Sequence, residues 1–212
     1  LSLHDALPIL ADADLDEAVK SAVIGRFQNT GQVCMAAKRF IVEAPIAEAF
    51  EKRFTAAVQA LTMGDPLDEK TFLGPMARAD LRDELDGQVK ATLREGARLV
   101  LGGEKVAGEG NYYAPTILAD VTPAMTAFRE ELFGPVAAIA VARDPQHALE
   151  IANDSDFGLS ATVWSGNEAI ADQLALQLEV GAVFVNGNGA SDPRVTIGGV
   201  KKSGYGRELS HF

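Results

Sequence analysis

The sequence predicts an α/β fold with a mostly parallel sheet flanked by helices, and two observations lead to this prediction. Short apolar segments of strand length alternate along the 212 residues with longer amphipathic segments of helix length. This alternation is typical of β-α-β units, whose strands run parallel. No repeat, low-complexity tract or linker interrupts the pattern, which favours a single domain. Parallel sheets bind ligands at the carboxyl ends of their strands, so we expect the functional site at that edge.

The first helix is expected from Asp14 to Phe27. Asp14 can cap it and Glu17 completes a capping-box-like pair, followed by apolar residues at helical spacing. A second helix begins at Ala44-Pro45, where the missing N–H of proline costs no helical hydrogen bond. The other predicted elements are strands at 39–43, 98–101, 136–142, 160–165 and 182–185, an extended segment at 112–118, and helices at 78–95, 144–153 and 168–178.

Composition narrows the class of protein. Apolar residues make up 47% of the chain and charged residues 23%, which suits a folded domain with a sizeable core. The net charge of −11 argues against nucleic acid and anionic membranes as partners. The longest clear apolar run, 136–142, is too short to span a bilayer. A single cysteine forbids an internal disulfide, suits a reducing, cytoplasmic compartment and, with three scattered histidines, predicts no metal site.

The single cysteine, Cys34, lies where a polar loop meets an apolar strand. A lone cysteine is more often a small buried apolar residue than a nucleophile. Here, however, Asn29, Thr30 and Gln32 surround Gly31 just before it, which is unusual beside a merely structural thiol. Backbone N–H groups of such a loop can hold an oxyanion that develops on a bound carbonyl. The loop is therefore a candidate site of nucleophilic catalysis.

The same stretch resembles the catalytic-cysteine signature of the aldehyde dehydrogenase superfamily. The matching residues are Phe27, Asn29, Gly31, Gln32, Cys34 and Arg39. The resemblance implies the Rossmann-like catalytic domain of that family and NAD(P)-dependent oxidation of an aldehyde. The Cys34 thiolate would attack the aldehyde carbon, and a thiohemiacetal and then a thioester would follow. A free thiol is only slightly ionised at neutral pH, so the site must favour the thiolate.

Two further segments extend the resemblance. Residues 130–135 read Glu-Glu-Leu-Phe-Gly-Pro, which on its own fits a solvated helix end. In the family, the residues matching Glu131 and Phe133 hold the nicotinamide ribose and pack near the nicotinamide of NAD or NADP, and a carboxylate can accept two hydroxyl hydrogen bonds. Residues 197–208 look like a flexible surface turn but resemble a family segment near the active site, with Ile197 replacing the usual Phe. In some members the residue matching Glu208 relays protons.

Within the family, the sequence from about residue 10 onward is most similar to bacterial succinate-semialdehyde dehydrogenases. This similarity implies oxidation of succinate semialdehyde to succinate. Many of these enzymes carry Arg where this chain has Gln28, which can hydrogen-bond a carboxylate but supplies no charge. Asn29 is assigned to the substrate side as well. Arg194 is either a second anion contact or a solvated surface residue. A dehydrogenase for another aldehyde remains the alternative.

The resemblance begins at about residue 10 and sets the expected domain boundaries. Residues 1–9 are expected to be a non-native leader, 10–196 the catalytic domain, and 197–212 a truncated segment that returns toward the cofactor and oligomerisation region. Family members supply the general base from a Glu upstream of the cysteine, and residues 1–10 contain no Glu. We therefore expect the chain by itself to be inactive and the intact enzyme to be a homo-oligomer.

Two other classes of protein stay open on the sequence. A cysteine hydrolase would need a histidine near Cys34, and His147 is the interior candidate. A non-catalytic binding or structural domain would show ordinary alkylation kinetics at Cys34.

Overall fold

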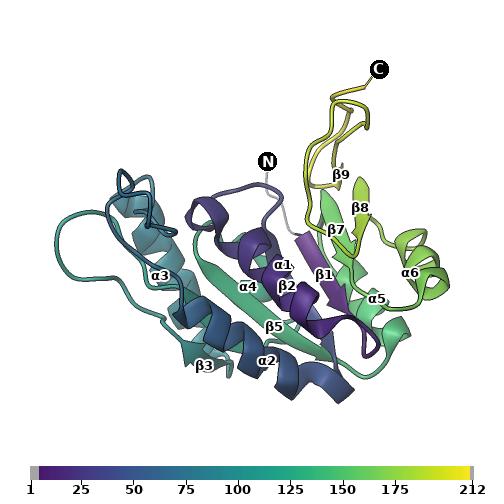
Figure 1. The fold of residues 1–212 in the computed structure, drawn as a ribbon, viewed down its shortest axis with the longest axis horizontal. Helices are drawn as coiled ribbons and strands as arrows, with labels where there is room; N and C mark the ends of the chain where they lie inside the picture. Colours follow the sequence, from purple (N-terminus) through teal and green to yellow (C-terminus); the bar gives the residue numbers. More distant parts are fainter. Residues whose placement is uncertain (1–4, 211–212) are drawn as a thin grey trace.

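The computed structural model describes residues 5–210 and contains a seven-stranded sheet (Figure 1). Adjacent strands run parallel except for β3 and β4, which are antiparallel. In spatial order the strands are β3 (Arg98–Leu101), β4 (Thr116–Ala119), β5 (Val136–Ala142), β2 (Ala37–Glu43), β1 (Asp5–Ile9), β7 (Ser160–Val163) and β8 (Ala182–Val185). The predicted α/β class with a mostly parallel sheet is confirmed.

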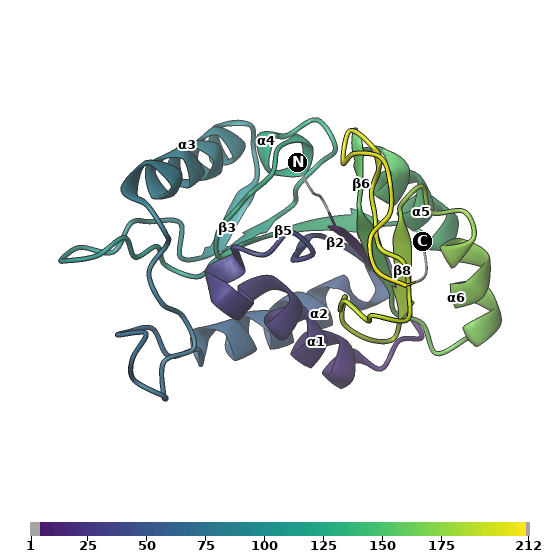
Figure 2. The ribbon, with the colours of Figure 1, turned by 90° about the horizontal axis from the view of Figure 1, so that it is seen from above.

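Helices cover both faces of the sheet (Figure 2). On one face lie α1 (Leu15–Phe27) and α2 (Ala44–Gln59), and on the other lie α3 (Ala79–Arg94), α4 (Thr126–Arg129), α5 (Pro145–Asn153) and α6 (Glu168–Ala175). A 3₁₀ turn, η1 (Gln28–Gly31), follows α1, and a short antiparallel pair joins β6 (Phe157–Gly158) to β9 (Val200–Lys201). Each face therefore has its own buried apolar cluster.

Four phenylalanines form the centre of the cluster under α1 and α2. Phe40 from β2 packs on Phe54 with ring centroids 5.1 Å apart, and Phe54 stacks on Phe50 at 5.2 Å. Phe27, at the end of α1, lies 6.1 Å from Phe54, and all four side chains are fully buried. Because α1 ends against this cluster, the loop that follows it starts from a fixed point.

Strand β1 lies inside residues 1–9, the segment expected to be a non-native leader. Asp5–Ile9 pairs in parallel with β2 and also pairs with β7, and Leu7 and Ile9 are buried. Residues 5–9 thus belong to the sheet, which differs from the expected domain boundary at residue 10. Residues 1–4 lie outside the described residues.

The candidate site residues lie at the opposite edge of the sheet from the one expected. Cys34 precedes β2, Phe133 precedes β5, and Phe157 and Leu159 precede β7. These strands are parallel, so all these residues lie at the amino-terminal edge of the sheet rather than at its carboxyl edge. The carboxyl ends of the strands lead instead into the starts of α1, α2 and α5.

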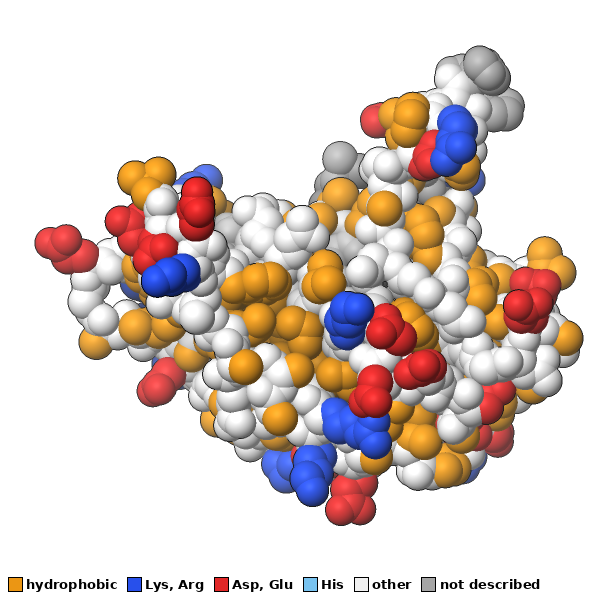
Figure 3. All heavy atoms as spheres, in the orientation of Figure 1, with side chains coloured by type: hydrophobic (Ala, Val, Ile, Leu, Met, Phe, Trp, Pro, Cys, Tyr) orange, Lys and Arg blue, Asp and Glu red, His pale blue; other side chains and the backbone are white. Residues whose placement is uncertain are grey.

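Acidic and basic side chains are intermingled on the face shown in Figure 3. None of the helices formed by residues 5–210 has the length and apolar character needed to cross a bilayer.

Candidate active site

The Cys34 loop has an unusual backbone. After α1, the consecutive residues Asn29, Thr30 and Gly31 all have left-handed conformations, with φ of 52°, 56° and 70°. Such conformations are costly for residues other than glycine and are found mainly where the surroundings enforce them. The Asn29 side chain donates to the carbonyl of Gln32 at 3.0 Å, which closes the turn. The thiol of Cys34, two residues further on, is exposed.

Contacts with a second segment hold this loop in place. The Thr30 hydroxyl donates to the carbonyl of Gly74 at 3.1 Å, and the Gln32 side chain accepts from the backbone N–H of Ala77 at 2.8 Å. These bonds connect the loop to the chain just before α3. The polar residues around Gly31 are therefore anchors of the loop, which explains why they accompany the cysteine.

Arg26 joins the Cys34 loop to the turn before β5. Its buried guanidinium donates to the carbonyl of Gly31 at 2.9 Å, to that of Leu132 at 3.1 Å, and also to that of Gly134. The backbone of Gly31 packs so closely on Gly134 that a Cβ atom at Gly31 would overlap the Gly134 carbonyl oxygen. Glycine is needed here for both its left-handed φ and this close approach.

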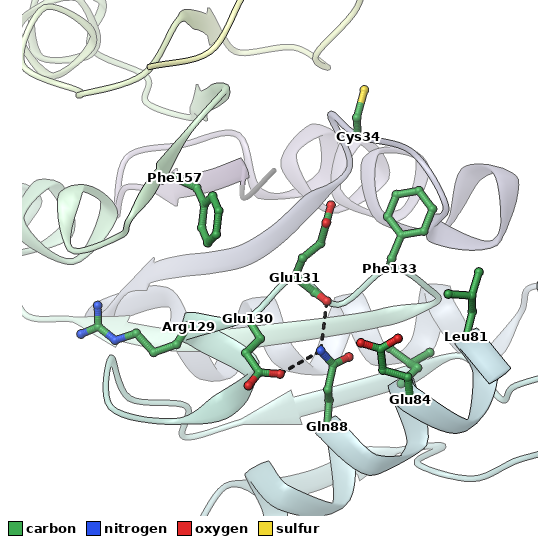
Figure 4. Close-up of a pocket in the computed structure, with 10 residues that line it drawn as sticks. Cys34, Leu81, Glu84, Gln88, Arg129, Glu130, Glu131, Phe133 and Phe157 are labelled. Atoms are coloured by element: carbon green, nitrogen blue, oxygen red, sulfur yellow. Dashed lines mark hydrogen bonds between the residues drawn. The ribbon is translucent and has the colours of Figure 1, made fainter. Parts of the chain in front are cut away.

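A cavity of about 750 Å³ opens on one side of Cys34, and Glu131 and Phe133 line it (Figure 4). Both side chains point toward the Cys34 loop in Figure 4, and Phe133 is 37% exposed. Gln88 of α3 forms part of the opposite wall. Its amide donates to the Glu130 carboxylate at 3.0 Å and to the Glu131 carbonyl at 3.2 Å, which fixes the turn that carries both glutamates.

A second cavity, of about 420 Å³, lies on the other side of Cys34 and is lined by Met35 and by the segment 197–208, including Glu208. Ile197 and Glu208 exchange two backbone hydrogen bonds, of 3.0 and 2.8 Å, so the segment doubles back on itself. The Lys201 ammonium anchors its base by donating to the carbonyls of Asn153 and Ser155 at 2.9 and 3.1 Å. The segment is thus tied to the end of α5.

An ion pair between Lys202 and Asp156 holds the same base of the segment. The hydrogen bond from Lys202 lowers the pKa of the exposed Asp156 carboxyl below its usual range. The Ser203 hydroxyl, which is buried, accepts from the backbone N–H of Gly158 at 2.9 Å. The cysteine therefore lies between two cavities whose walls come from different parts of the chain.

Comparison with known proteins assigns the chain to a family. The model of the "Aldehyde dehydrogenase family" matches residues 1–212. The chain belongs to the aldehyde dehydrogenase family. It is 68% identical over 208 residues to succinate semialdehyde dehydrogenase [NAD(P)+] of Escherichia coli, a match that covers 98% of this chain and 45% of that protein. It is 47% identical to a probable succinate-semialdehyde dehydrogenase [NADP(+)] of Synechocystis, covering 98% and 46%.

Solved structures of this aldehyde dehydrogenase family share the fold. Lactaldehyde dehydrogenase of Escherichia coli superimposes with a TM-score of 0.97 at 34% identity, covering 100% of this chain and 44% of that one. Betaine aldehyde dehydrogenase of Staphylococcus aureus, in complex with NAD+, gives 0.95 at 31% identity, covering 98% and 42%. The chain spans about half the length of the relatives it matches.

The structure separates the sequence-predicted site residues of this family member into two groups. Cys34, Glu131, Phe133 and Glu208 line two cavities, and Cys34 lines both of them. Gln28, Asn29 and Arg194 are exposed and lie elsewhere. Gln28 lines a small separate cavity of about 60 Å³ with Met35, and Asn29 bonds within its own turn. The Arg194 guanidinium pairs with Asp192 at 2.6 Å and lowers the pKa of that carboxyl, while its side chain is 86% exposed.

His147 is far from the cysteine. It lies in the first turn of α5, beyond the carboxyl end of β5, and its Nδ1 accepts from the backbone N–H of Arg143 at 3.1 Å. Cys34 is at the opposite edge of a sheet whose strand β5 is seven residues long, or roughly 20 Å at the usual rise per residue. The arrangement that a cysteine hydrolase with His147 as its base requires is therefore absent.

Sequence reasoning missed three residues that hold the site together: Arg26, Lys38 and Gln88. Lys38 was the most visible of them, because it stands beside Arg39 as a pair of cations at the start of a strand that then becomes apolar. Arg26 and Gln88 fall on helices where a polar residue is ordinary, so no pattern distinguished them.

Proposed function

We propose that Cys34 is the nucleophile of an NAD(P)-dependent aldehyde dehydrogenase and that succinate semialdehyde is its substrate. One observation carries the proposal: the exposed Cys34 lines two cavities, one containing Glu131 and Phe133 and the other Glu208. Oxidation of an aldehyde by hydride transfer needs an acceptor and a substrate on either side of the reacting carbon, and this arrangement provides two such spaces.

The first step is addition of the Cys34 thiolate to the aldehyde carbon. The new C–S bond places the former carbonyl electron pair on oxygen, which becomes the oxyanion of a thiohemiacetal. Backbone N–H groups of the Cys34 loop would stabilise this charge, and removing one such donor from an active site typically costs about 10²–10³ in turnover. The loop anchors at Thr30 and Gln32 keep these groups in place.

The larger cavity would hold the nicotinamide end of the cofactor. Glu131 offers a carboxylate that can accept hydrogen bonds from both ribose hydroxyls, and the exposed ring of Phe133 offers an apolar surface for the nicotinamide. When bound there, the cofactor supplies the hydride acceptor that turns the thiohemiacetal into a thioester. Support for this cofactor comes from relatives whose names specify NAD(P)+ or NADP+.

Release of the acid requires water and a route for its proton. Glu208 lines the second cavity, where a carboxylate can take up and pass on a proton. We further infer that a general base outside this chain activates the water, so that the 212-residue chain alone does not turn over. The family resemblance also supports a homo-oligomeric, cytoplasmic enzyme.

The choice of succinate semialdehyde rests on relatives, foremost the Escherichia coli protein that is 68% identical. The test is a chimera in which this chain replaces the matching 208-residue region of that protein. We expect the chimera to form NAD(P)H faster with succinate semialdehyde than with butanal, which has the same chain length but no carboxylate. Equal rates with the two aldehydes would contradict succinate semialdehyde as the preferred substrate. The absence of NAD(P)H formation with any aldehyde would refute the proposed activity.

A further inference from the structure

A buried ammonium group lies beneath the Cys34 loop. Lys38, the second residue of β2, has a side chain that is 0% exposed. Its Nζ lies 3.5 Å from the carbonyl oxygen of Cys34 and 3.4 Å from that of Ala36, close enough to donate to both. It also lies 3.7 Å from Oε1 of Glu131, whose side chain is 20% exposed. One side chain thus contacts both the backbone of the cysteine and the carboxylate that faces the larger cavity.

An ammonium in this position is costly unless it has a specific partner. Moving a charged group out of water is unfavourable, and well-packed apolar residues often replace buried ion pairs without loss of stability. Phe40, Ile41 and Val42 of the same strand are fully buried and apolar, and Arg39 between them and Lys38 is a second buried cation with its own partners, the carbonyls of Ile151 and Ala152. Packing therefore does not account for a lysine at position 38.

We propose that Lys38 is a positioning residue that links the nucleophile loop to the carboxylate of Glu131. The proposal rests on the proposed function, in which Glu131 binds the ribose of the cofactor and Cys34 attacks the aldehyde. Lys38 holds the carbonyls of Cys34 and Ala36 and the Glu131 carboxylate around one charge. This contact sets the position of the thiol relative to the ribose-binding group before any ligand is present.

The link can be tested in the 212-residue chain without cofactor or aldehyde, by the rate of Cys34 alkylation with iodoacetamide. Four chains form a cycle: the unsubstituted chain, Lys38→Met, Glu131→Gln and the double variant. Substitutions at contacting residues are typically non-additive. We measure the factor by which Glu131→Gln changes the rate, once with Lys38 and once with Lys38→Met. We expect these two factors to differ by about threefold or more. Effects that simply multiply would overturn the proposal.

Two controls separate this link from a general loss of structure. Glu48→Gln changes an exposed glutamate near the start of α2, beyond the carboxyl end of β2 and away from both cavities at Cys34, so it should leave the rate unchanged. Arg39→Met removes another buried cation of β2 that donates to backbone carbonyls, here those of Ile151 and Ala152, so its effect should multiply with that of Glu131→Gln.

If Lys38→Met does not fold, two single variants still decide the question. Glu131→Gln should change the alkylation rate and Glu48→Gln should not. Equal effects from the two glutamates, or none from Glu131→Gln, would overturn the role of Lys38. Because this assay does not involve oxidation, it can fail while the chimera still forms NAD(P)H, and the reverse also holds.

Discussion

Replacing Gly31 with alanine tests whether the close contact between the Cys34 loop and Gly134 stabilises the protein. Gly31 has φ of 70°, a conformation that costs an L-residue about 1–2 kcal/mol. The added methyl group would overlap the Gly134 carbonyl, so the two backbones must separate. Separation weakens the 2.9 Å hydrogen bond from Arg26 to the Gly31 carbonyl, and a bond from a charged donor contributes about 1.5–3 kcal/mol. We expect a loss of about 3 kcal/mol in the free energy of unfolding.

The assay is urea unfolding, with Cys34 alkylation as a second readout. Gly87→Ala is the matched control, because Gly87 lies within α3 and an added Cβ would have no neighbour within 4 Å. Alanine there should stabilise the protein by about 0.5–1 kcal/mol. The alkylation rate should change in Gly31→Ala and stay constant in Gly87→Ala. A Gly31→Ala variant as stable as the unsubstituted protein would refute the reasoning.

Three further predictions follow from the structure. Phe54→Ala should lower the free energy of unfolding by about 3–5 kcal/mol, because Phe54 is fully buried among Phe27, Phe40 and Phe50; a loss under about 1 kcal/mol in urea unfolding would contradict this packing. The pKa of Glu95 is lowered by hydrogen bonds from the backbone N–H and hydroxyl of Thr126. The stabilisation of the fold by the Glu95 carboxylate is therefore present above the unfolded-state pKa and is lost as pH falls through the folded-state pKa. The stability difference between the unsubstituted chain and Glu95→Gln should therefore shrink at acidic pH, and a difference that is constant with pH would argue against that bond. The 212-residue chain alone should form no NADH from succinate semialdehyde, and measurable NADH would show that it already contains a sufficient base.

Local sequence signals predicted most helices because their ends depend on nearby residues. Asp14 accepts from the backbone N–H groups of Asp16 and Glu17, as its position before an apolar run indicated. Asp144 caps α5 in the same way. Strand β1 had no comparable signal. Pro8 cannot donate to a sheet and is rare in interior strands, yet it pairs with Ile41 of β2. The position of β1 is set by its pairing with β2, whose residues are distant in the sequence.

The site shows the same division between local and distant information. The sequence motifs predicted that Cys34, Glu131, Phe133 and Glu208 belong to one site, and all four line the two cavities that share Cys34. Arg194 was open to two interpretations, and the structure places its guanidinium on Asp192 at the surface. The candidate residues lie at the amino edge of the sheet and not at the expected carboxyl edge, since the rule for carboxyl ends describes open α/β sheets in general. Cys34 follows a helix and precedes a strand, which places it at the amino edge.

The nucleophilic role proposed for Cys34 is tested most directly by NAD(P)H formation by the chimera with and without Cys34→Ser. Serine keeps the shape of the side chain but is a far weaker nucleophile near neutral pH. We expect the turnover of succinate semialdehyde to fall by at least about 10³-fold, as when the nucleophile of a catalytic unit is removed. A Cys34→Ser chimera that keeps its turnover within about tenfold of the unsubstituted chimera would contradict the account.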